Sequence, residues 1–159
     1  MQSDYLEKII VSAGVGKLRL ASPQFEEKAL PEIMKEFAAI TGQKPAITKA
    51  KKSIAGFKVR QGEVVGLKAV LRGKRMNDFL SRVVNVVLPR VRDFRGLSPK
   101  SIDQNGNLSF GFRDQLVFPE INPETSRVNF GIEVTLVSRL KNKEKAIDFY
   151  RSQGIPLAK

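Results

Sequence analysis

The chain has 159 residues, 42% of them hydrophobic and 28% charged, a composition typical of one globular domain that needs neither a metal ion nor a disulfide to fold. Its charge is unbalanced, because 28 Lys and Arg against 16 Asp and Glu give a formal net charge of +12, and so large an excess of cations indicates an anionic partner. The sequence has no His and no Cys, which excludes the commonest general base, thiol chemistry and nearly all structural zinc sites.

The chain is predicted to begin with a strand and a helix. Residues 6–13 are rich in β-branched residues and stop at Gly14, as a strand does. A helix is expected from Ser22, a fair N-cap, to Gly42, because apolar residues recur there every three or four positions. Pro31 lies inside this run and is expected to divide it.

Two further strands are expected at residues 46–48 and 66–71. The segment between them is basic and contains Gly56 and Gly62. It forms either a long hairpin or an extended mobile loop, and the pattern does not decide between the two.

The second half of the chain is predicted to form a helix, two strands and a last helix. An apolar stripe over residues 76–88 indicates the helix, which Pro89 ends or kinks. Residues 108–112 and 131–137 read as strands, and Asn142 caps the last helix. Strands joined by both hairpins and helices predict an α+β fold, in which a mostly antiparallel sheet has helices packed on one face and the other face free for a partner.

Most of the positive charge lies in one stretch of the sequence. Residues 44–75 hold ten cations and a single acid, Glu63, so +9 of the +12 falls in 32 residues. A solvated surface normally mixes charges of both signs, and we therefore interpret this stretch as a phosphate-binding surface that releases counter-ions, rather than as a means to solubility. Phe57, the one aromatic residue in the segment, either stacks on an exposed base or anchors the loop. The free sheet face and this basic loop are thus predicted to bind RNA.

A second basic cluster follows Pro89. Arg90, Arg92 and Arg95 flank Asp93, and they are expected to contact RNA or protein or to pair with nearby acids.

No catalytic constellation is apparent. The run Gly14-Val15-Gly16-Lys17 resembles a phosphate-binding loop, but Val11 stands where that motif needs Gly and Leu18 where it needs Ser or Thr. We expect no enzyme activity, no cofactor and no metal site. The densest apolar stretch, residues 83–88, is only six residues long, so we also expect no association with a membrane.

Several blocks of the sequence resemble one family, the bacterial-type large-subunit ribosomal protein L5. The match runs in order from about residue 6 to residue 156, and two of its blocks exceed ten residues. The blocks are GQKP at 42–45, KAKKSIAGFKVRQG at 49–62, LRGKRM at 71–76, LPRVRDFRGLS at 88–98, DQNGN at 103–107 and QLVFPEI at 115–121.

The resemblance implies a structural role in the cytoplasm, bound to the ribosome. Members of this family bind 5S rRNA and help to attach it in the central protuberance, where other proteins and the large-subunit rRNA are neighbours. They also touch the elbow of the P-site tRNA and bridge to a protein of the small-subunit head. For 5S rRNA the resemblance implies the first strand, the position of Gln43 and the strand that leads to Arg72 and Gly73. Together with the charge pattern, this predicts polar contacts by Ser12 and Gln43 and phosphate contacts by Lys44, Lys49, Lys51, Lys52, Arg72 and Arg75. The positions implied for the tRNA-facing loop are Phe57, Lys58, Arg60, Gln61 and Gly62.

The sequence departs from the family's pattern in two ways. The family usually opens with a helix before the first strand, whereas here Met1 nearly begins that strand, so we expect one domain over residues 1–159 without that helix. The family also carries Asn where Ser12 stands and Thr where Val70 stands. Ser12 can still form a hydrogen bond to RNA but the side chain of Val70 cannot, which predicts weaker 5S binding. The alternative function is a free-standing regulatory RNA- or DNA-binding module on a similar scaffold.

Overall fold

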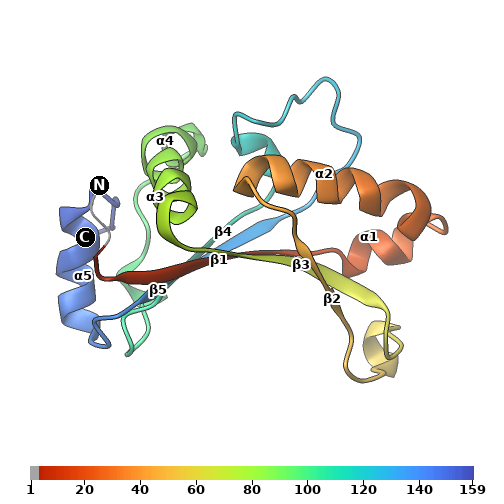
Figure 1. Cartoon of the computed structure of the whole chain (residues 1–159), viewed down its shortest axis with the longest axis horizontal. Helices are drawn as coiled ribbons and strands as arrows, with labels where there is room; N and C mark the ends of the chain where they lie inside the picture. The colour runs from red at the N-terminus through yellow and green to blue at the C-terminus, as the bar shows by residue number, and fades with distance from the viewer. Residues whose placement is uncertain (1–3) are drawn as a thin grey trace.

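Figure 1 shows an antiparallel sheet of five strands with helices over one of its faces. This computed structural model describes residues 4–159. The strand order is β2-β3-β1-β5-β4, so the first strand of the chain lies at the centre and pairs with strands from the later part of the sequence. The bounds are β1 Leu6–Gly14, β2 Ala46–Lys49, β3 Val64–Leu71, β4 Leu108–Phe112 and β5 Ile132–Ser138.

Helices α1 to α4 lie over the upper face of the sheet in Figure 1, and α5 stands at one end. Within residues 4–159 no helix covers the lower face, which we call the open face. The helical bounds are α1 Gly16–Ala21, α2 Leu30–Thr41, α3 Gly73–Arg82, α4 Leu88–Arg90 and α5 Lys143–Ser152. Two π-helical turns, η1 Phe25–Ala29 and η3 Val83–Val87, precede α2 and α4, and 3-10 turns are found at η2 Ala55–Phe57, η4 Pro99–Ser101 and η5 Gln115–Val117.

The hydrophobic core lies between the sheet and the helices. Along β1, Ile9, Val11 and Ala13 are buried, whereas Ile10 and Ser12 point to the open face and are only half-buried. This period of two is the alternation expected of a strand with one face in the core. The helices supply fully buried residues to the same core, among them Ile33, Phe37, Ile40, Phe79 and Leu80. The predicted α+β fold with helices on one face is confirmed.

The predicted start of the first long helix is wrong. The chain first forms the short helix α1, and Ser22 ends it with an extended backbone (φ −124°, ψ 118°), so Ser22 does not cap the next helix. Leu18 and Phe25 both pack against the core, and the chain turns between them to bring both there. The expected division of the helix at Pro31 is not found: Ala29 and Leu30 both keep a helical backbone, so η1 runs directly into α2, and Pro31 lies in the first turn of α2, where proline is tolerated.

The basic segment after β2 is part of a long hairpin. Strands β2 and β3 are antiparallel, with Ala46 opposite Lys68 and Thr48 opposite Gly66. Residues 50–63 connect these two strands and project beyond the sheet (Figure 1), and together with Lys49, the last residue of β2, they form what we call the basic arm. Of the two predicted alternatives, the hairpin is the one that the structure contains.

Candidate nucleic-acid interface

The open face of the sheet has mixed polarity at its centre, where Ile10 lies opposite Val70 and the next row across the strands is polar. The strand register places Ser12 of β1 opposite Lys68 of β3 on one side and opposite Glu133 of β5 on the other. Ser12 is half-buried, and its hydroxyl has no hydrogen-bond partner within residues 4–159, so it is free to bond to a ligand. Farther along, the hydroxyls of Ser109 and Thr135 lie 3.1 Å apart on the same face. The predicted contact residue Ser12 therefore stands on an accessible surface.

Gln43 lies at the end of β3 rather than on the open face. Its amide nitrogen donates a hydrogen bond to the carbonyl oxygen of Val70 over 3.1 Å, and its amide oxygen accepts one from the guanidinium of Arg75 over 3.3 Å. Buried Thr41 donates to the carbonyl oxygen of Gln43 over 3.0 Å, and Gly42 turns the chain there with a left-handed φ of 78°. The structure thus brings the predicted residues Gln43 and Arg75 together, with Gln43 orienting the guanidinium of Arg75.

Cations gather at the N-terminus of α3, next to Gln43. Arg72, Lys74 and Arg75 are all exposed there. The helix dipole favours anions at this end by roughly 0.3–1 kcal/mol per charge, so three cations oppose it. An RNA phosphate bound at this corner would relieve that repulsion.

The basic arm carries a second group of cations at the other end of the same edge. Lys49, Lys51 and Lys52 are exposed where the arm leaves β2. They are separated from the α3 corner by the length of β3, eight residues or roughly 23 Å at 3.3 Å per residue. The predicted phosphate contacts therefore form two groups along one sheet edge, and Lys44 lies exposed on the connection from α2 to β2, between them in sequence.

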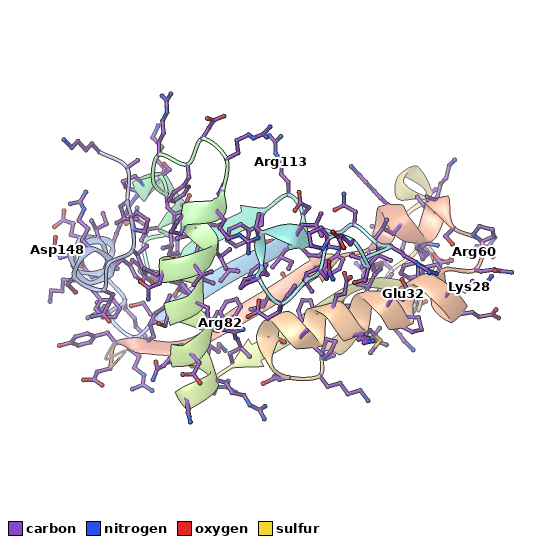
Figure 2. The ribbon with its side chains drawn as sticks, turned by 90° about the horizontal axis from the view of Figure 1, so that it is seen from above. Lys28, Glu32, Arg60, Arg82, Arg113 and Asp148 are labelled. Carbon is purple, nitrogen blue, oxygen red and sulfur yellow. The ribbon has the colours of Figure 1, made fainter. Side chains whose placement is uncertain are left out.

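The tip of the arm is folded by local hydrogen bonds. Ile54 and Val59 exchange backbone hydrogen bonds of 2.9 and 3.2 Å, and the hydroxyl of Ser53 accepts one of 2.9 Å from the backbone of Gln61. This arrangement leaves the side chains of Lys58 and Arg60 exposed, and Figure 2 shows Arg60 at the far end of the molecule.

Phe57, Gln61 and Gly62 at the tip were also predicted to belong to the tRNA-facing loop. Gly62 has a φ of 88°, which favours glycine at this turn, and both Gly62 and Gln61 are exposed. The side chain of Phe57 lies outside what the structure describes, so base stacking by Phe57 stays a prediction.

Arg19 of α1 holds the arm against the body of the protein. One guanidinium nitrogen donates to the carbonyl oxygen of Lys58 over 3.1 Å, and another pairs with the carboxylate of Glu63 at 2.9 Å. The same carboxylate oxygen accepts a 2.8 Å hydrogen bond from the backbone of Arg60. Glu63, the one acid among residues 44–75, is therefore engaged by Arg19, and it leaves the lysines of the arm to an outside anion.

The cluster after α4 is separate from these groups. Arg90, Arg92 and Arg95 are exposed, and the cavity next to Arg90 and Arg92 is lined by β4, which is the opposite edge of the sheet from β2. Arg113 joins this cavity and Arg95 does not.

Sequence reasoning did not single out Arg19, Lys68 or Arg113 as candidate contact residues. Arg19 and Lys58 are 39 positions apart, and no local pattern marks a contact of that range. Arg113 is isolated from other cations in the sequence. Lys68 alternates with buried Leu67 and Ala69, and that alternation did hold a signal that it faces outward.

These features define a class of protein. Exposed cations follow one edge of an antiparallel sheet, a projecting arm presents more of them, and a helix-free face of mixed polarity lies beside both. Within residues 4–159, no helix is long and apolar enough to cross a membrane, and no three or more carboxylates come together as a metal site would require. The basic edge and the basic arm are typical of α+β proteins that bind nucleic acid.

Comparison with known proteins gives the family. The family model described as "Ribosomal protein L5" matches residues 1–60, and the model of the C-terminal part of the same family matches residues 64–157. The chain is 49% identical over its whole length to the large ribosomal subunit protein uL5 of Carboxydothermus hydrogenoformans and 45% identical to that of Lacticaseibacillus casei, covering 86% of each. It is 48% identical to uL5 of Pseudothermotoga lettingae over 95% of this chain and 80% of the relative.

The chain belongs to the ribosomal protein L5 family. It is accordingly a structural protein of the large ribosomal subunit and not an enzyme. This agrees with the resemblance found in the sequence blocks above.

Proposed function

We propose that the chain binds 5S rRNA and helps to attach it in the central protuberance of the large subunit. The observation that carries this proposal is the unneutralised row of cations along the β2–β3 edge, from the basic arm to the N-terminus of α3. Lys44, Lys49, Lys51, Lys52, Arg72 and Arg75 bind phosphates, while Ser12 and Gln43 make polar contacts to sugars or bases.

The whole chain acts as one domain in this proposal. One continuous core supports it, because β1 pairs with β3 on one side and with β5 on the other and all three strands contribute buried residues. The protein works in the cytoplasm as part of the ribosome, and its neighbours there include large-subunit rRNA and other proteins of the central protuberance.

The tip of the basic arm faces the elbow of the P-site tRNA in the same proposal. Lys58 and Arg60 are exposed at the tip and can reach a phosphate backbone, and Gln61, Gly62 and Phe57 complete the tip. A further surface bridges to a protein of the small-subunit head. In assembled ribosomes, replacing both Lys58 and Arg60 with Ala should weaken P-site tRNA binding and leave 5S rRNA content unchanged. Unaltered tRNA binding would count against this role of the tip.

The experiment that tests 5S binding is a titration of 5S rRNA with the Lys51→Ala/Lys52→Ala variant at several salt concentrations. Removing two phosphate contacts should weaken binding and reduce the slope of log K against log salt by about 2, at roughly 0.9 per contact. The matched control is Lys143→Ala/Lys145→Ala, which removes the same charge from the first turn of α5, at one end of the sheet. If both double variants lose affinity equally, net charge and not this edge determines binding.

The alternative function, a free-standing regulatory RNA- or DNA-binding module, is tested by sedimentation of cell extract through sucrose at moderate salt. We expect the chain to sediment with large subunits. Recovery mainly in the unbound fraction would contradict the proposal.

A further inference from the structure

One ion pair fastens the backbone of the two residues that carry the cations of the arm's tip. Arg19 donates from one guanidinium nitrogen to the carbonyl oxygen of Lys58 over 3.1 Å, and a second nitrogen lies 2.9 Å from the Oε2 atom of Glu63. The same Oε2 atom accepts a 2.8 Å hydrogen bond from the backbone nitrogen of Arg60. We call this arrangement the latch. It holds the backbone of Lys58 and Arg60 while their side chains stay exposed.

The latch is largely shielded from water. The side chain of Arg19 is 13% exposed and that of Glu63 is 31% exposed. The Nε atom of Arg19 is buried and has no hydrogen-bond partner among residues 4–159. A guanidinium in such surroundings needs its counter-charge, because an unpaired buried charge is costly, whereas a fully exposed ion pair contributes little. The closed latch is therefore favoured before any RNA is bound.

Helix α1 gives the latch a firm base. Val15, directly before α1, is fully buried, and its backbone nitrogen donates a 3.0 Å hydrogen bond to the carbonyl oxygen of Val65 in β3. Leu18, one position before Arg19, packs against the hydrophobic core. Because α1 is fixed to the sheet and to the core, Arg19 fixes the tip of the arm to both.

The tip needs this support because it has few other anchors. Lys58 has a left-handed backbone (φ 53°, ψ 39°), which residues with a β-carbon adopt at a cost. None of residues 50–62 is buried, leaving aside Phe57, whose side chain lies outside what the structure describes. A segment with so little buried apolar surface opens easily unless something else ties it down. The latch is the tie that connects this segment to α1.

We propose that Arg19 and Glu63 are positioning residues that order the tip of the arm before tRNA arrives, without touching RNA themselves. With the latch closed, Lys58 and Arg60 stand on a fixed backbone, so a phosphate chain binds without first having to order the loop. The inference rests on the proposed function for the identity of the ligand. The ordering of the tip is a property of the free chain and is measured without any RNA.

Amide hydrogen exchange on the free chain tests the ordering. Five amides of the arm donate hydrogen bonds within it, so their exchange reports on its order: Ile54, Lys58, Val59, Arg60 and Gln61. Arg19→Met keeps an apolar stem and removes both donors. It should raise the exchange of these amides roughly tenfold or more and leave the amides at the centre of β1 unchanged.

The matched control is Arg82→Met. It removes an arginine of α3 that is paired with Glu120, and Figure 2 shows Arg82 well away from Arg60. This variant should leave the exchange of the tip at the wild-type rate. If Arg19→Met does not fold, Arg19→Lys takes its place, because a single ammonium cannot occupy both positions of the planar guanidinium, and exchange at the tip should still rise about threefold.

A double-variant comparison shows whether the two residues act through one contact. Arg19→Met and Glu63→Met should each raise exchange at the tip. Together they should raise it by much less than the product of the two single effects, since each removes the same ion pair. Effects that multiply in full would contradict a shared latch.

The functional arm of the test measures P-site tRNA binding in assembled ribosomes at several salt concentrations. Arg19→Met should weaken binding roughly 3- to 10-fold and leave the salt slope unchanged, because it removes no phosphate contact. Lys58→Ala/Arg60→Ala should weaken binding and also reduce the slope. Arg82→Met should bind tRNA as wild type does.

Three results would overturn the inference. They are wild-type exchange at the tip in Arg19→Met, disorder of the tip with no loss of tRNA affinity, and a salt slope reduced by about 0.9, which would make Arg19 itself a phosphate contact. Failure of the proposed function looks different. In that case Lys58→Ala/Arg60→Ala would leave tRNA binding unaltered, and the ordering of the tip by the latch would still be decided by hydrogen exchange on the free chain.

Discussion

Gln115 is a buried polar group on which the loop before β5 depends. Its side chain is 0% exposed. The amide nitrogen lies 3.0 Å from a carboxylate oxygen of Glu36, 3.2 Å from the hydroxyl of Ser126 and 2.6 Å from the carbonyl oxygen of Val128. The amide oxygen accepts a 3.2 Å hydrogen bond from the backbone of Phe130. One side chain thus ties α2 to three points along the loop.

Replacing Gln115 with Leu keeps the volume similar and removes all of these hydrogen bonds. The bond to the Glu36 carboxylate is worth roughly 1.5–3 kcal/mol and each bond to a neutral backbone group about 1 kcal/mol, while the new apolar side chain recovers part of the loss. We expect a net destabilisation of about 3 kcal/mol. For a domain of this length, that lowers the melting temperature by roughly 6–12 °C.

Urea unfolding followed by circular dichroism measures this loss directly, and the exposed Gln104→Leu is the matched control with an expected change within about 0.5 kcal/mol. Gln115→Glu adds a second readout, because it sets a carboxylate against that of Glu36. The pKa of one of the two should rise, so this variant should lose stability as pH increases from about 4 to 7 and regain it on acidification. A Gln115→Leu variant that loses less than about 1 kcal/mol would refute the role assigned to this hydrogen-bond network.

Three further outcomes are expected. Gly66→Ala should destabilise the protein by about 2 kcal/mol in urea unfolding, because the new β-carbon would lie 2.8 Å from the carbonyl oxygen of Ala13 and 2.9 Å from the hydroxyl of Thr48. An unchanged unfolding midpoint would show that β1 and β2 can move away from β3 at this position without a loss of stability. Burial raises the pKa of Tyr150, whose hydroxyl donates a 2.6 Å hydrogen bond to the carbonyl oxygen of Gly106, so folding favours the protonated phenol and stability should fall as pH rises above about 10. Tyr150→Phe should cost about 1–2 kcal/mol at pH 7 and show a smaller fall at high pH, and a variant with the same alkaline profile as wild type would speak against this cause. Val70→Thr places a hydroxyl on the open face, and in a filter assay it should tighten 5S rRNA binding by roughly 2- to 12-fold, the equivalent of about 0.5–1.5 kcal/mol. Unchanged or weaker binding would argue that RNA does not reach this position.

The strands were predictable for two different local reasons. In β5, apolar residues alternate with polar ones from Ile132 to Leu136, and this period of two both predicts a strand and says which side faces the core. β1 was predictable from its β-branched residues and the glycine that ends it, and its run Ile9-Ile10-Val11 does not say by itself which side is buried. The C-terminal end of α2 was predictable for a similar local reason, since Gly42 takes the left-handed conformation that ends a helix. The helix start at Ser22 was not, because packing of Leu18 and Phe25 against the core overrode the local capping preference.

For the candidate site, the concentration of cations could be predicted from the sequence, whereas the contacts between distant residues could not. The density of cations between residues 44 and 75 is visible in the sequence and marks one edge of the folded sheet. The contact of Arg19 with Lys58 and the arrival of Arg113 beside Arg90 depend on strand order, which brings together residues that are far apart in the chain. Nothing local to those residues indicates the contacts they make.

A titration of 5S rRNA with the wild-type chain at increasing salt tests the central claim most directly. With Lys44, Lys49, Lys51, Lys52, Arg72 and Arg75 on phosphates, log K should fall with log salt at a slope of about −5, and binding should be tight in dilute buffer. The absence of binding at low salt, or binding that salt leaves unchanged, would contradict the assignment of this sheet edge to RNA.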